Sequence, residues 1–384
     1  MPTIKDVARQ CGVSIATVSA VINNAEWVPE DTRSRVREVI QKLNYRPNRL
    51  AQGLKTRRSF TVGVIVSDIT NPFYTDIVRS LSHELREQDR NLVLCDSDHR
   101  FDVGAQNYRM LLEKQVDGIV LIGDSVREST VAGFVGENPS VPVVAIERDY
   151  RIEGISKLLV DSEMGAFDAT MHFVRQGFTR IGMISGPLTG PGSKSYGRLH
   201  QYSGYRRALQ QGGVEFDGFL VVDGDFRFSG GQSAMRTLME LPDPPDAVFA
   251  ANDMMALGAM DVARRMGYSV PSDVAVIGYD DIPIAAHTSP PLTTMAIPKA
   301  ELGRSAAKLL LERLKNPAGS QPVRRIFTAE LVVRSSAVYM FDAALPNVSV
   351  TAAHINESTS ESAQEHATAV VGEHLLNEAA QDAI

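Results

Sequence analysis

Apolar residues recur at helical spacing over roughly the first forty-five positions of the chain. The stripe of the first predicted helix consists of Ile4, Val7, Ala8 and Cys11. Thr3 and Asp6 form a capping-box pattern at its start, and Gly12 supplies the conformational freedom that a tight turn needs. We therefore expect a helix of about two turns that begins near Ile4.

Two further helices are predicted in the same segment. The second has Ser14 as its N-cap, inward residues Val18, Val21 and Ile22, and outward residues Ile15, Ala16, Ser19 and Ala20. The third opens at Pro29 and has an apolar stripe of Val36, Val39, Ile40 and Leu43. This spacing is typical of a helix-turn-helix, whose second helix enters the major groove of DNA. A small helical bundle of another use has the same periodicity.

From Thr61 onward the pattern changes to short apolar, β-branched runs separated by helical stretches. The runs of a first series lie at 61–66, 92–95, 118–122 and 141–146, and those of a second at 180–185, 219–222, 247–251 and 274–278. Strands that alternate with helices in this way indicate parallel sheets built from βαβ units. We therefore expect an α/β fold: an all-α head followed by two doubly wound parallel-sheet subdomains with a cleft between them.

Charge is distributed unevenly along the chain, although the net value is −7. Residues 1–60 carry 11 Lys and Arg against 5 Asp and Glu, whereas residues 341–384 carry 7 acidic residues and no Lys or Arg. A basic head supplies the sequence-independent attraction to DNA phosphates. The negative net charge therefore does not exclude a nucleic-acid partner.

Composition excludes several other classes of protein. With 43% hydrophobic and 22% charged residues, the chain has enough apolar side chains for sizeable cores. Its two cysteines, Cys11 and Cys95, cannot build a disulfide framework or a four-cysteine zinc site. The first residues lack the apolar core of a secretory signal, and no stretch approaches about eighteen apolar residues, so we expect a cytoplasmic protein without a membrane partner. We expect no metal and no cofactor.

Polar and aromatic residues follow the carboxyl ends of the predicted strands, where open parallel sheets bind ligands. In the first series they are Asp68, Asn71, Phe73, Tyr74, Glu147 and Arg148, and in the second Asp225, Phe226, Asn252, Asp253, Asp280 and Asp281. Carboxylates, amides, an arginine and aromatic faces suit a hydroxylated or nitrogenous small molecule. Several of these residues, such as Asn252, would equally serve as helix N-caps.

Five sequence blocks of the head resemble the lactose-repressor (LacI/GalR) family of bacterial transcription regulators. They are 3–8, 12–14, 17–19, 21–23 and 44–48. The resemblance implies a helix-turn-helix DNA-binding domain at 1–46 and, at 47–59, a hinge helix and linker, with Leu54 of the hinge helix inserted into the minor groove. The residues alone are equally compatible with a flexible linker there. The implied DNA contacts are Thr3, Ser14, Ile15, Ala16, Thr17, Ser19, Ala20, Asn23, Tyr45, Asn48, Leu54 and Lys55.

The resemblance extends through the body to about residue 338, in blocks such as 71–74, 252–258 and 276–281. It implies a periplasmic-binding-protein-like effector-binding and dimerisation core at 60–340, with a first subdomain at about 60–161 and 292–322 and a second at about 162–291 and 323–340. The implied effector contacts are Phe73, Tyr74, Arg148, Arg198, Gln201, Phe226, Asn252 and Asp280. The implied partners are a pseudo-palindromic double-stranded DNA operator, a small-molecule effector such as a sugar or another metabolite, and a second copy of the chain.

Two positions depart from the family pattern. Where relatives often carry Arg or His to contact bases, this chain has Ala20, which can contact a thymine methyl group but cannot hydrogen-bond a base edge. Where relatives usually carry an effector-binding arginine, it has Gln201, and we expect Arg198 to occupy the same space. The sequence therefore predicts base recognition through apolar contacts and an effector clamp that differs from the family's.

Our leading hypothesis is a DNA-binding repressor that is controlled by an effector and is not an enzyme, but two other functions remain open. The α/β architecture also hosts enzymes, and the loop 186–195 differs from a phosphate-binding loop at Ser193, where a glycine is needed before the lysine. A small-molecule-binding protein would share the body but not the basic head. The acidic tail, 341–384, lies outside the resemblance and has the composition of a disordered segment.

Overall fold

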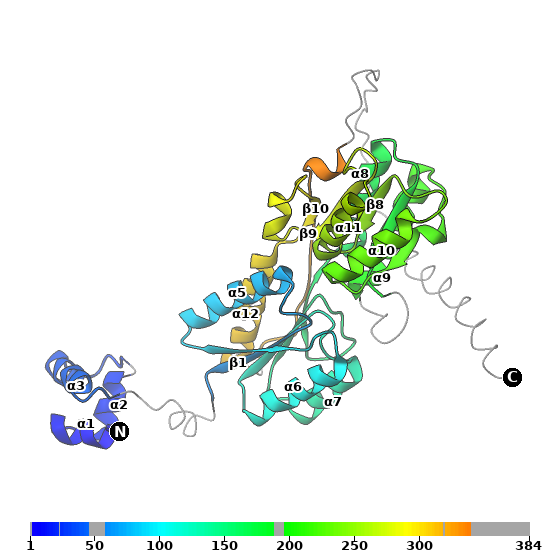
Figure 1. Ribbon diagram of the computed structural model, residues 1–384. Coiled ribbons are helices and arrows are strands. Elements are labelled where there is room, and N and C mark those ends of the chain that lie inside the picture. The colour runs from blue at the N-terminus through cyan, green and yellow to red at the C-terminus, as the bar shows by residue number, and fades with distance from the viewer. Residues whose placement is uncertain (1, 23, 46–57, 188–195, 318, 339–384) are drawn as a thin grey trace, which may run out of the picture. The chain divides into compact units, whose positions relative to one another are not determined.

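The computed structural model describes residues 2–22, 24–45, 58–187, 196–317 and 319–338 of the 384-residue chain (Figure 1). These residues form a helical head and two α/β halves, each built around its own six-stranded sheet. The expected fold class is therefore confirmed.

The head consists of α1 (Ile4–Cys11), α2 (Ile15–Ile22) and α3 (Glu30–Lys42). Before α1, Asp6 Oδ2 accepts hydrogen bonds from the backbone N–H and the hydroxyl of Thr3, at 2.9 and 2.7 Å. Gly12 follows α1 with φ +64°, a left-handed conformation that glycine adopts without steric cost. Ser14 Oγ accepts the N–H of Thr17 at 3.0 Å and so caps α2. The predicted starts of both helices are confirmed.

A small apolar core joins the three helices of the head. Its buried members are Val7, Ala8, Cys11, Val18, Val21, Val28, Val36 and Tyr45. Ile15 faces outward as expected, with 44% of its surface exposed. Ala20, which we expected on the same outward face, is instead half-buried and packs against this core.

The first half is built on a sheet whose strands are all parallel. It contains β1 (Thr61–Val66), β2 (Asn91–Asp96), β3 (Gly118–Ile122), β4 (Val143–Ile146), β5 (Ser156–Val160) and β11 (Arg324–Phe327), in the order β11-β5-β4-β3-β1-β2. Its helices are α5 (Pro72–Glu87), α6 (Phe101–Glu113), α7 (Glu128–Glu137) and α12 (Lys299–Lys315). Figure 1 shows α5 and α12 on one face of the sheet and α6 and α7 on the other.

The second half repeats this arrangement. Its sheet contains β6 (Ile181–Ser185), β7 (Val221–Asp223), β8 (Ala247–Ala250), β9 (Ala275–Asp280), β10 (Thr293–Ala296) and β12 (Glu330–Val332), in the order β12-β10-β9-β8-β6-β7. β12 is antiparallel to β10, and the other pairs are parallel. Its helices are α8 (Ser162–Arg175), α9 (Tyr196–Gly212), α10 (Phe228–Met239) and α11 (Asp253–Arg265), with 3₁₀ turns at Gly218–Leu220, Pro283–His287 and Ser335–Ala337.

Strand pairing moves two of the expected subdomain boundaries by a few residues. Because β10 pairs with β9, residues 293–296 belong to the second sheet, whereas we expected the first subdomain to resume at 292. Because β11 pairs with β5, residues 324–327 belong to the first sheet, whereas we expected the second to resume at 323. The sequence did not predict β11, since three of its four residues are exposed and it has no apolar run.

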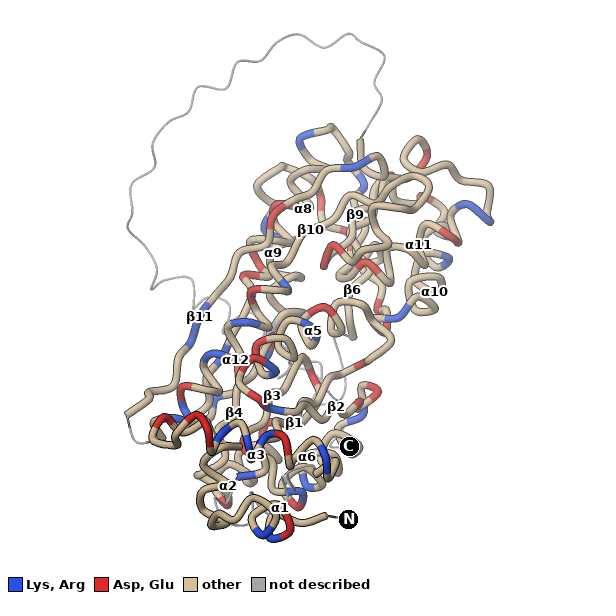
Figure 2. The backbone as a smooth tube through the Cα atoms, turned by 90° about the vertical axis from the view of Figure 1, so that its left-hand side faces the viewer, with Lys and Arg blue, Asp and Glu red and all other residues tan. Residues whose placement is uncertain are grey.

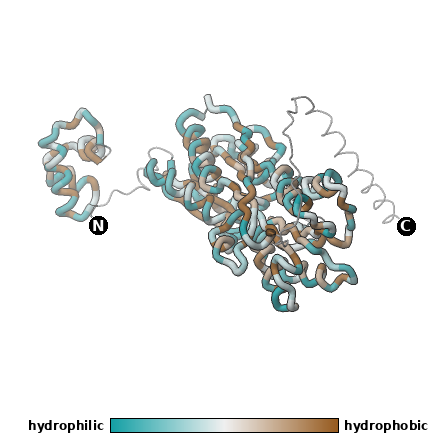
Figure 3. Tube along the Cα trace, turned by 90° about the horizontal axis from the view of Figure 1, so that it is seen from above, coloured by the Kyte–Doolittle hydropathy of each residue, from teal (hydrophilic) through white to brown (hydrophobic). Residues whose placement is uncertain are grey.

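Burial follows the two sheets. Hydrophobic positions run through the interior of the two halves, while hydrophilic positions cover the outer helices and loops (Figure 3). β3 and β6 are buried along their whole length, as expected for central parallel strands covered on both faces. Lys and Arg are interspersed with Asp and Glu over both halves (Figure 2). One buried apolar cluster continues from the first half into the second, and a further cluster belongs to the first half alone.

Candidate functional site

A cavity lies between the two halves, at the carboxyl ends of their parallel strands. From the first half it is lined by Ser67, Asn71, Phe73, Tyr74, His99, Gly123, Asp124 and Glu147, and from the second by Ser162, Gly197, Gln201, Phe226, Ala251, Asn252, Tyr279 and Asp280, with Ile297 from the crossover after β10. Ligands of open parallel sheets bind at this edge. The open volume is about 90 Å³, well below the roughly 300–1,000 Å³ of pockets for drug-sized ligands, so the space suits a small molecule.

Most of the sequence-predicted effector contacts meet in this cavity. Those that line it are Phe73, Tyr74, Gln201, Phe226, Asn252 and Asp280. Arg148 stands behind the wall, where its Nη1 donates to Oδ1 of the lining residue Asp124 and its guanidinium lies 5.4 Å from the Tyr150 ring centroid. The side chain of Arg198 lies outside the described residues.

Helix starts and strand ends hold the amides of the site in fixed positions. Asn71 Oδ1 accepts the N–H of Phe73 at 3.0 Å and so caps α5. Asn252 Oδ1 accepts the N–H of Met255 at 2.8 Å, and its Nδ2 donates to the Phe226 carbonyl at 2.9 Å. Asn252 is therefore both an N-cap and a cavity residue, so the two interpretations that the sequence left open hold together.

Two carboxyl groups of the cavity differ from the amides in having few donors around them. Glu147 Oε1 accepts the Val160 N–H at 2.7 Å, and burial raises the pKa of Glu147 to about 7. Asp280 is 7% exposed, and burial together with the nearby Asp253 raises its pKa well above the ordinary value. Lys299 Nζ donates to the backbone carbonyl oxygens of Asp280 and Asp281. The cavity therefore offers acceptor oxygens that a ligand's donors could fill.

Four lining residues have backbones at positive φ, which non-glycine residues rarely adopt. They are His99 (φ +56°), Glu147 (φ +58°), Phe226 (φ +63°) and Asp280 (φ +116°). Such conformations persist only where the surroundings hold them, and they collect at ligand-binding sites. The backbone at this cavity is therefore positioned by the fold rather than by local preference.

Comparison with known proteins assigns both parts of the chain. Residues 3–48 match the model for bacterial regulatory proteins, lacI family, and residues 170–337 match that for a periplasmic binding protein-like domain. The chain is 38% identical to the ribose operon repressor of Escherichia coli (strain K12) over 338 residues, which cover 88% of this chain and 100% of that protein. The chain belongs to the lacI family of bacterial regulatory proteins.

Other relatives of this lacI-family chain are also repressors. It is 35% identical to the HTH-type transcriptional repressor PurR of Aliivibrio salmonicida, over 88% of this chain and 99% of that protein. Its fold is similar to the lac repressor dimer bound to operator and the anti-inducer ONPF, with a TM-score of 0.75 and 25% identity over 88% and 99% of the two chains. The CelR–cellobiose complex is similar at a TM-score of 0.65 and 34% identity, over 88% of this chain and 100% of that one.

The prediction of a DNA-binding repressor is therefore confirmed. This lacI-family chain is a DNA-binding transcriptional repressor whose core has the fold of small-molecule-binding proteins. Both curated relatives compared above are named as repressors. None of the helices within the described residues has the length and hydrophobicity needed to span a bilayer.

The sequence missed several residues that line the cavity of this lacI-family repressor. The most polar are Ser67, His99, Asp124, Ser162 and Tyr279. Asp124 follows the end of β3 by two residues, so the rule that located Asp68 and Glu147 could have found it. His99 and Ser162 lie beyond β2 and β5, and neither position has a signal in the sequence that separates it from an ordinary loop or helix start.

Several sequence predictions fall outside the described residues. They are the contacts Asn23, Asn48, Leu54 and Lys55, residues 47–57 of the hinge segment, residues 188–195 of the loop 186–195, and the tail after 338. Tyr45, a predicted DNA contact, is 9% exposed and belongs to the core of the head. Its contribution to DNA binding stays a prediction.

Proposed function

We propose that this repressor acts as a homodimer on a pseudo-palindromic operator in the cytoplasm, and that a small molecule in the cavity sets its operator affinity. Two copies of one head present two identical recognition helices, which match two half-sites related by a two-fold axis. A molecule that binds one arrangement of the two halves more tightly than another shifts the population toward it. The same coupling makes DNA affinity depend on the effector.

The effector we propose is small, rich in hydrogen-bond donors, and uncharged or cationic. The observation that carries this proposal is Asp280, which is buried at the cavity wall and has no hydrogen bond to its carboxylate among the described residues. Glu147 and Asp124 bring further carboxyl groups to the same cavity, so an anionic ligand would meet repulsion. One relative is named for the ribose operon and one similar structure holds cellobiose, which supports hydroxyl groups as the donors.

The test is operator binding by the full-length protein in the presence of candidate effectors. We would first select the operator from genomic fragments, and then measure the anisotropy of the labelled duplex with ribose, cellobiose, a purine base and a sugar phosphate. An uncharged compound should change operator affinity, and the sugar phosphate should not. If only the sugar phosphate acts, the proposed effector class is wrong.

The Asp280→Asn variant connects that response to the cavity. The substitution replaces a carboxyl oxygen that can accept from the effector with an amide N–H₂ group that cannot, so at least about ten times more effector should be needed for the same change in operator affinity. Asp102→Asn is the matched control, since Asp102 is 61% exposed on α6 and pairs only with neighbouring Arg100. Equal responses of the two variants would contradict an effector contact at Asp280.

The head offers an independent test of DNA recognition. We propose that Ile15, at the exposed start of α2, contacts a thymine methyl group, so Ile15→Ala should relax selection at one A·T position of each half-site. Phe219→Ala is the control, because Phe219 is 80% exposed in the second half. Trp27 is the only tryptophan and is 67% exposed in the head, so its fluorescence reports operator binding directly. Unchanged selection by Ile15→Ala would exclude this contact.

A further inference from the structure

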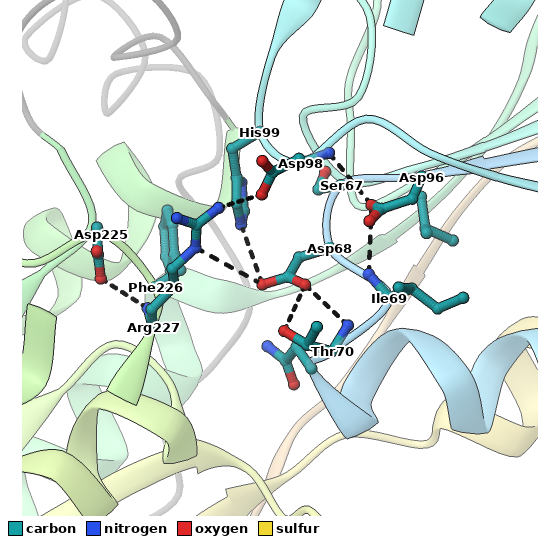
Figure 4. Close-up of polar contacts among 12 residues, drawn as sticks. Ser67, Asp68, Ile69, Thr70, Asp96, Asp98, His99, Asp225, Phe226 and Arg227 are labelled. Carbon is teal, nitrogen blue, oxygen red and sulfur yellow. Dashed lines mark hydrogen bonds and ion pairs between the residues drawn. The ribbon is translucent and has the colours of Figure 1, made fainter. Parts of the chain in front are cut away.

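Five side chains from the two halves meet beside the cavity. Asp68, Asp98 and His99 belong to the first half, and Phe226 and Arg227 to the second (Figure 4). Arg227 Nη2 donates to Asp98 Oδ1, and its Nε lies 4.0 Å from Asp68 Oδ2. We call these five residues the cross-cleft cluster.

The cluster also contains a ring contact that reaches the cavity wall. The rings of His99 and Phe226 are stacked, with centroids 6.1 Å apart and planes 18° from parallel. His99 Nε2 lies 3.9 Å from Asp68 Oδ2, so one carboxylate faces both His99 and Arg227. His99 and Phe226 line the cavity, whereas Asp68, Asp98 and Arg227 do not. The ion pairs therefore lie outside the cavity, and the two rings lie at its wall.

Each half holds its part of the cluster in a strained backbone. Asp98 and His99 have φ of +50° and +56°, and Phe226 has φ of +63°. Asp96 Oδ1 accepts the Asp98 N–H at 3.1 Å, and Asp225 Oδ1 accepts the Arg227 N–H at 2.9 Å (Figure 4). Left-handed residues persist where their surroundings fix them, so both sides present their side chains in a set direction.

We propose that the cross-cleft cluster is a latch that holds the two halves closed around the effector, with Arg227 and Asp98 acting as positioning residues for effector binding. The inference rests on the proposed function, because it assumes an effector in the cavity. Closing the cleft brings the guanidinium to two carboxylates and places the stacked rings over the cavity edge. The ion pair between Arg227 and Asp98 then strengthens effector binding by stabilising the closed arrangement, although neither residue lines the cavity.

The test is charge reversal in the full-length protein, with hydrogen exchange as the readout that needs no ligand. Arg227→Glu places three acidic groups together, so amides at 96–100 and at 225–228 should both exchange several-fold faster. The double variant Arg227→Asp with Asp98→Arg restores one opposite-charge pair and should recover at least half of the lost protection. Arg236→Glu, a charge reversal at an exposed position of α10, is the control and should leave both segments unchanged.

Effector binding provides the second readout, with ribose as the probe. Arg227→Glu should weaken ribose binding about tenfold, and the double variant should recover it. Unchanged exchange in Arg227→Glu, or equal changes in Arg236→Glu, overturns the latch whatever ribose does. Faster exchange in both segments supports the latch, whether or not ribose binds. If neither ribose nor another candidate compound binds the unsubstituted protein, the proposed effector function is wrong, but the latch still stands.

Discussion

The two α/β halves of this repressor follow the same strand order from edge to edge, yet they surround their buried acids with different groups. In the first half, Asp117 is paired with Arg90 at 2.5 Å, with side chains that are 4% and 8% exposed. In the second half, Asp253 is fully buried, and its oxygens accept the Thr294 hydroxyl at 2.6 Å and the Ile282 N–H at 2.8 Å. Burial raises the pKa of Asp253 to about 7.

Asp117 precedes β3 and Asp253 follows β8, so these two acids lie at opposite ends of equivalent strands, and different neighbours compensate their charges. When a buried carboxylate loses its cationic partner, an uncompensated charge is left in the protein interior, which destabilises the fold. A carboxyl group held by neutral donors binds a proton near neutral pH and makes stability depend on pH. Glu147, at the end of β4 in the first half, resembles Asp253 because burial raises its pKa to about 7. A buried acid with a raised pKa therefore occurs in each half.

The largest effect should come from breaking the ion pair of the first half. Arg90→Ala leaves Asp117 buried with backbone and hydroxyl donors from Ser59 and Phe60 only, so the free energy of unfolding should fall by about 3 kcal/mol. Urea unfolding followed by circular dichroism measures the loss. Arg100→Ala is the control, because its pair with Asp102 is exposed and solvent screens the attraction between the two charges. Equal decreases in the free energy of unfolding in both variants would show that the buried ion pair stabilises the protein no more than the exposed one.

A smaller effect should appear in the pH dependence of the second half. The folded pKa of Asp253 is about 7 against an ordinary 3.8, so the folded state holds a proton that the unfolded chain has released. This contribution is complete below about pH 3.8 and is lost as pH rises through 7. Between pH 5 and 8 the free energy of unfolding should fall by about 2–3 kcal/mol more than in Asp253→Asn.

Asp102→Asn serves as the control for that measurement. Its side chain is exposed, and the hydrogen bond from Arg100 lowers the pKa of Asp102, so this group stays charged from pH 5 to 8 in both states. Its substitution should shift stability by the same amount at both pH values. If the free energy of unfolding of Asp253→Asn depends on pH as steeply as that of the unsubstituted protein, another group, such as Glu147, causes the pH dependence.

The smallest effect should come from removing one donor to Asp253. Thr294→Val deletes the hydroxyl that lowers the Asp253 pKa, so the pKa should rise further and stability at pH 8 should fall by about 1 kcal/mol. The midpoint of the pH dependence should move upward with it. Thr75→Val removes an exposed hydroxyl from α5 and should move neither quantity. A midpoint that stays in place would show that neutral donors do not tune this acid.

Local signals in the sequence predicted the head and most of the core. Thr3, Asp6, Gly12 and Ser14 act on their immediate neighbours, so their capping and turn functions can be recognised without the fold. Apolar runs predicted four strands of each sheet, whereas β5, β10, β11 and β12 were missed. The edge strands β11 and β12 are short and partly exposed, and β5 and β10 are short segments that begin with Ser and Thr. Ala20 differs from its prediction because it packs against the core that the three head helices share.

The part of the candidate site that the sequence predicted consists of residues that follow the carboxyl ends of predicted strands, which we call the strand-end rule. That rule found Phe73 and Asp280 because parallel strands of one sheet all end at the same edge. It could not find His99, whose position depends on a strained turn after β2 and on the opposing ring of Phe226. It placed Arg148 in the cavity, but the structure turns that side chain toward Asp124.

The sequence by itself determined the order of helices and strands, the basic head and the residue types available at the strand ends, because each depends on periodicity, capping or composition within a short stretch. Tertiary structure decided which acids are paired and which are left to hold a proton, because compensation depends on residues such as Arg90 and Asp117 that are 27 positions apart. It also decided that Asp98 and Arg227, 129 positions apart, meet across the cleft. Only the packing of one half against the other brings such groups within reach.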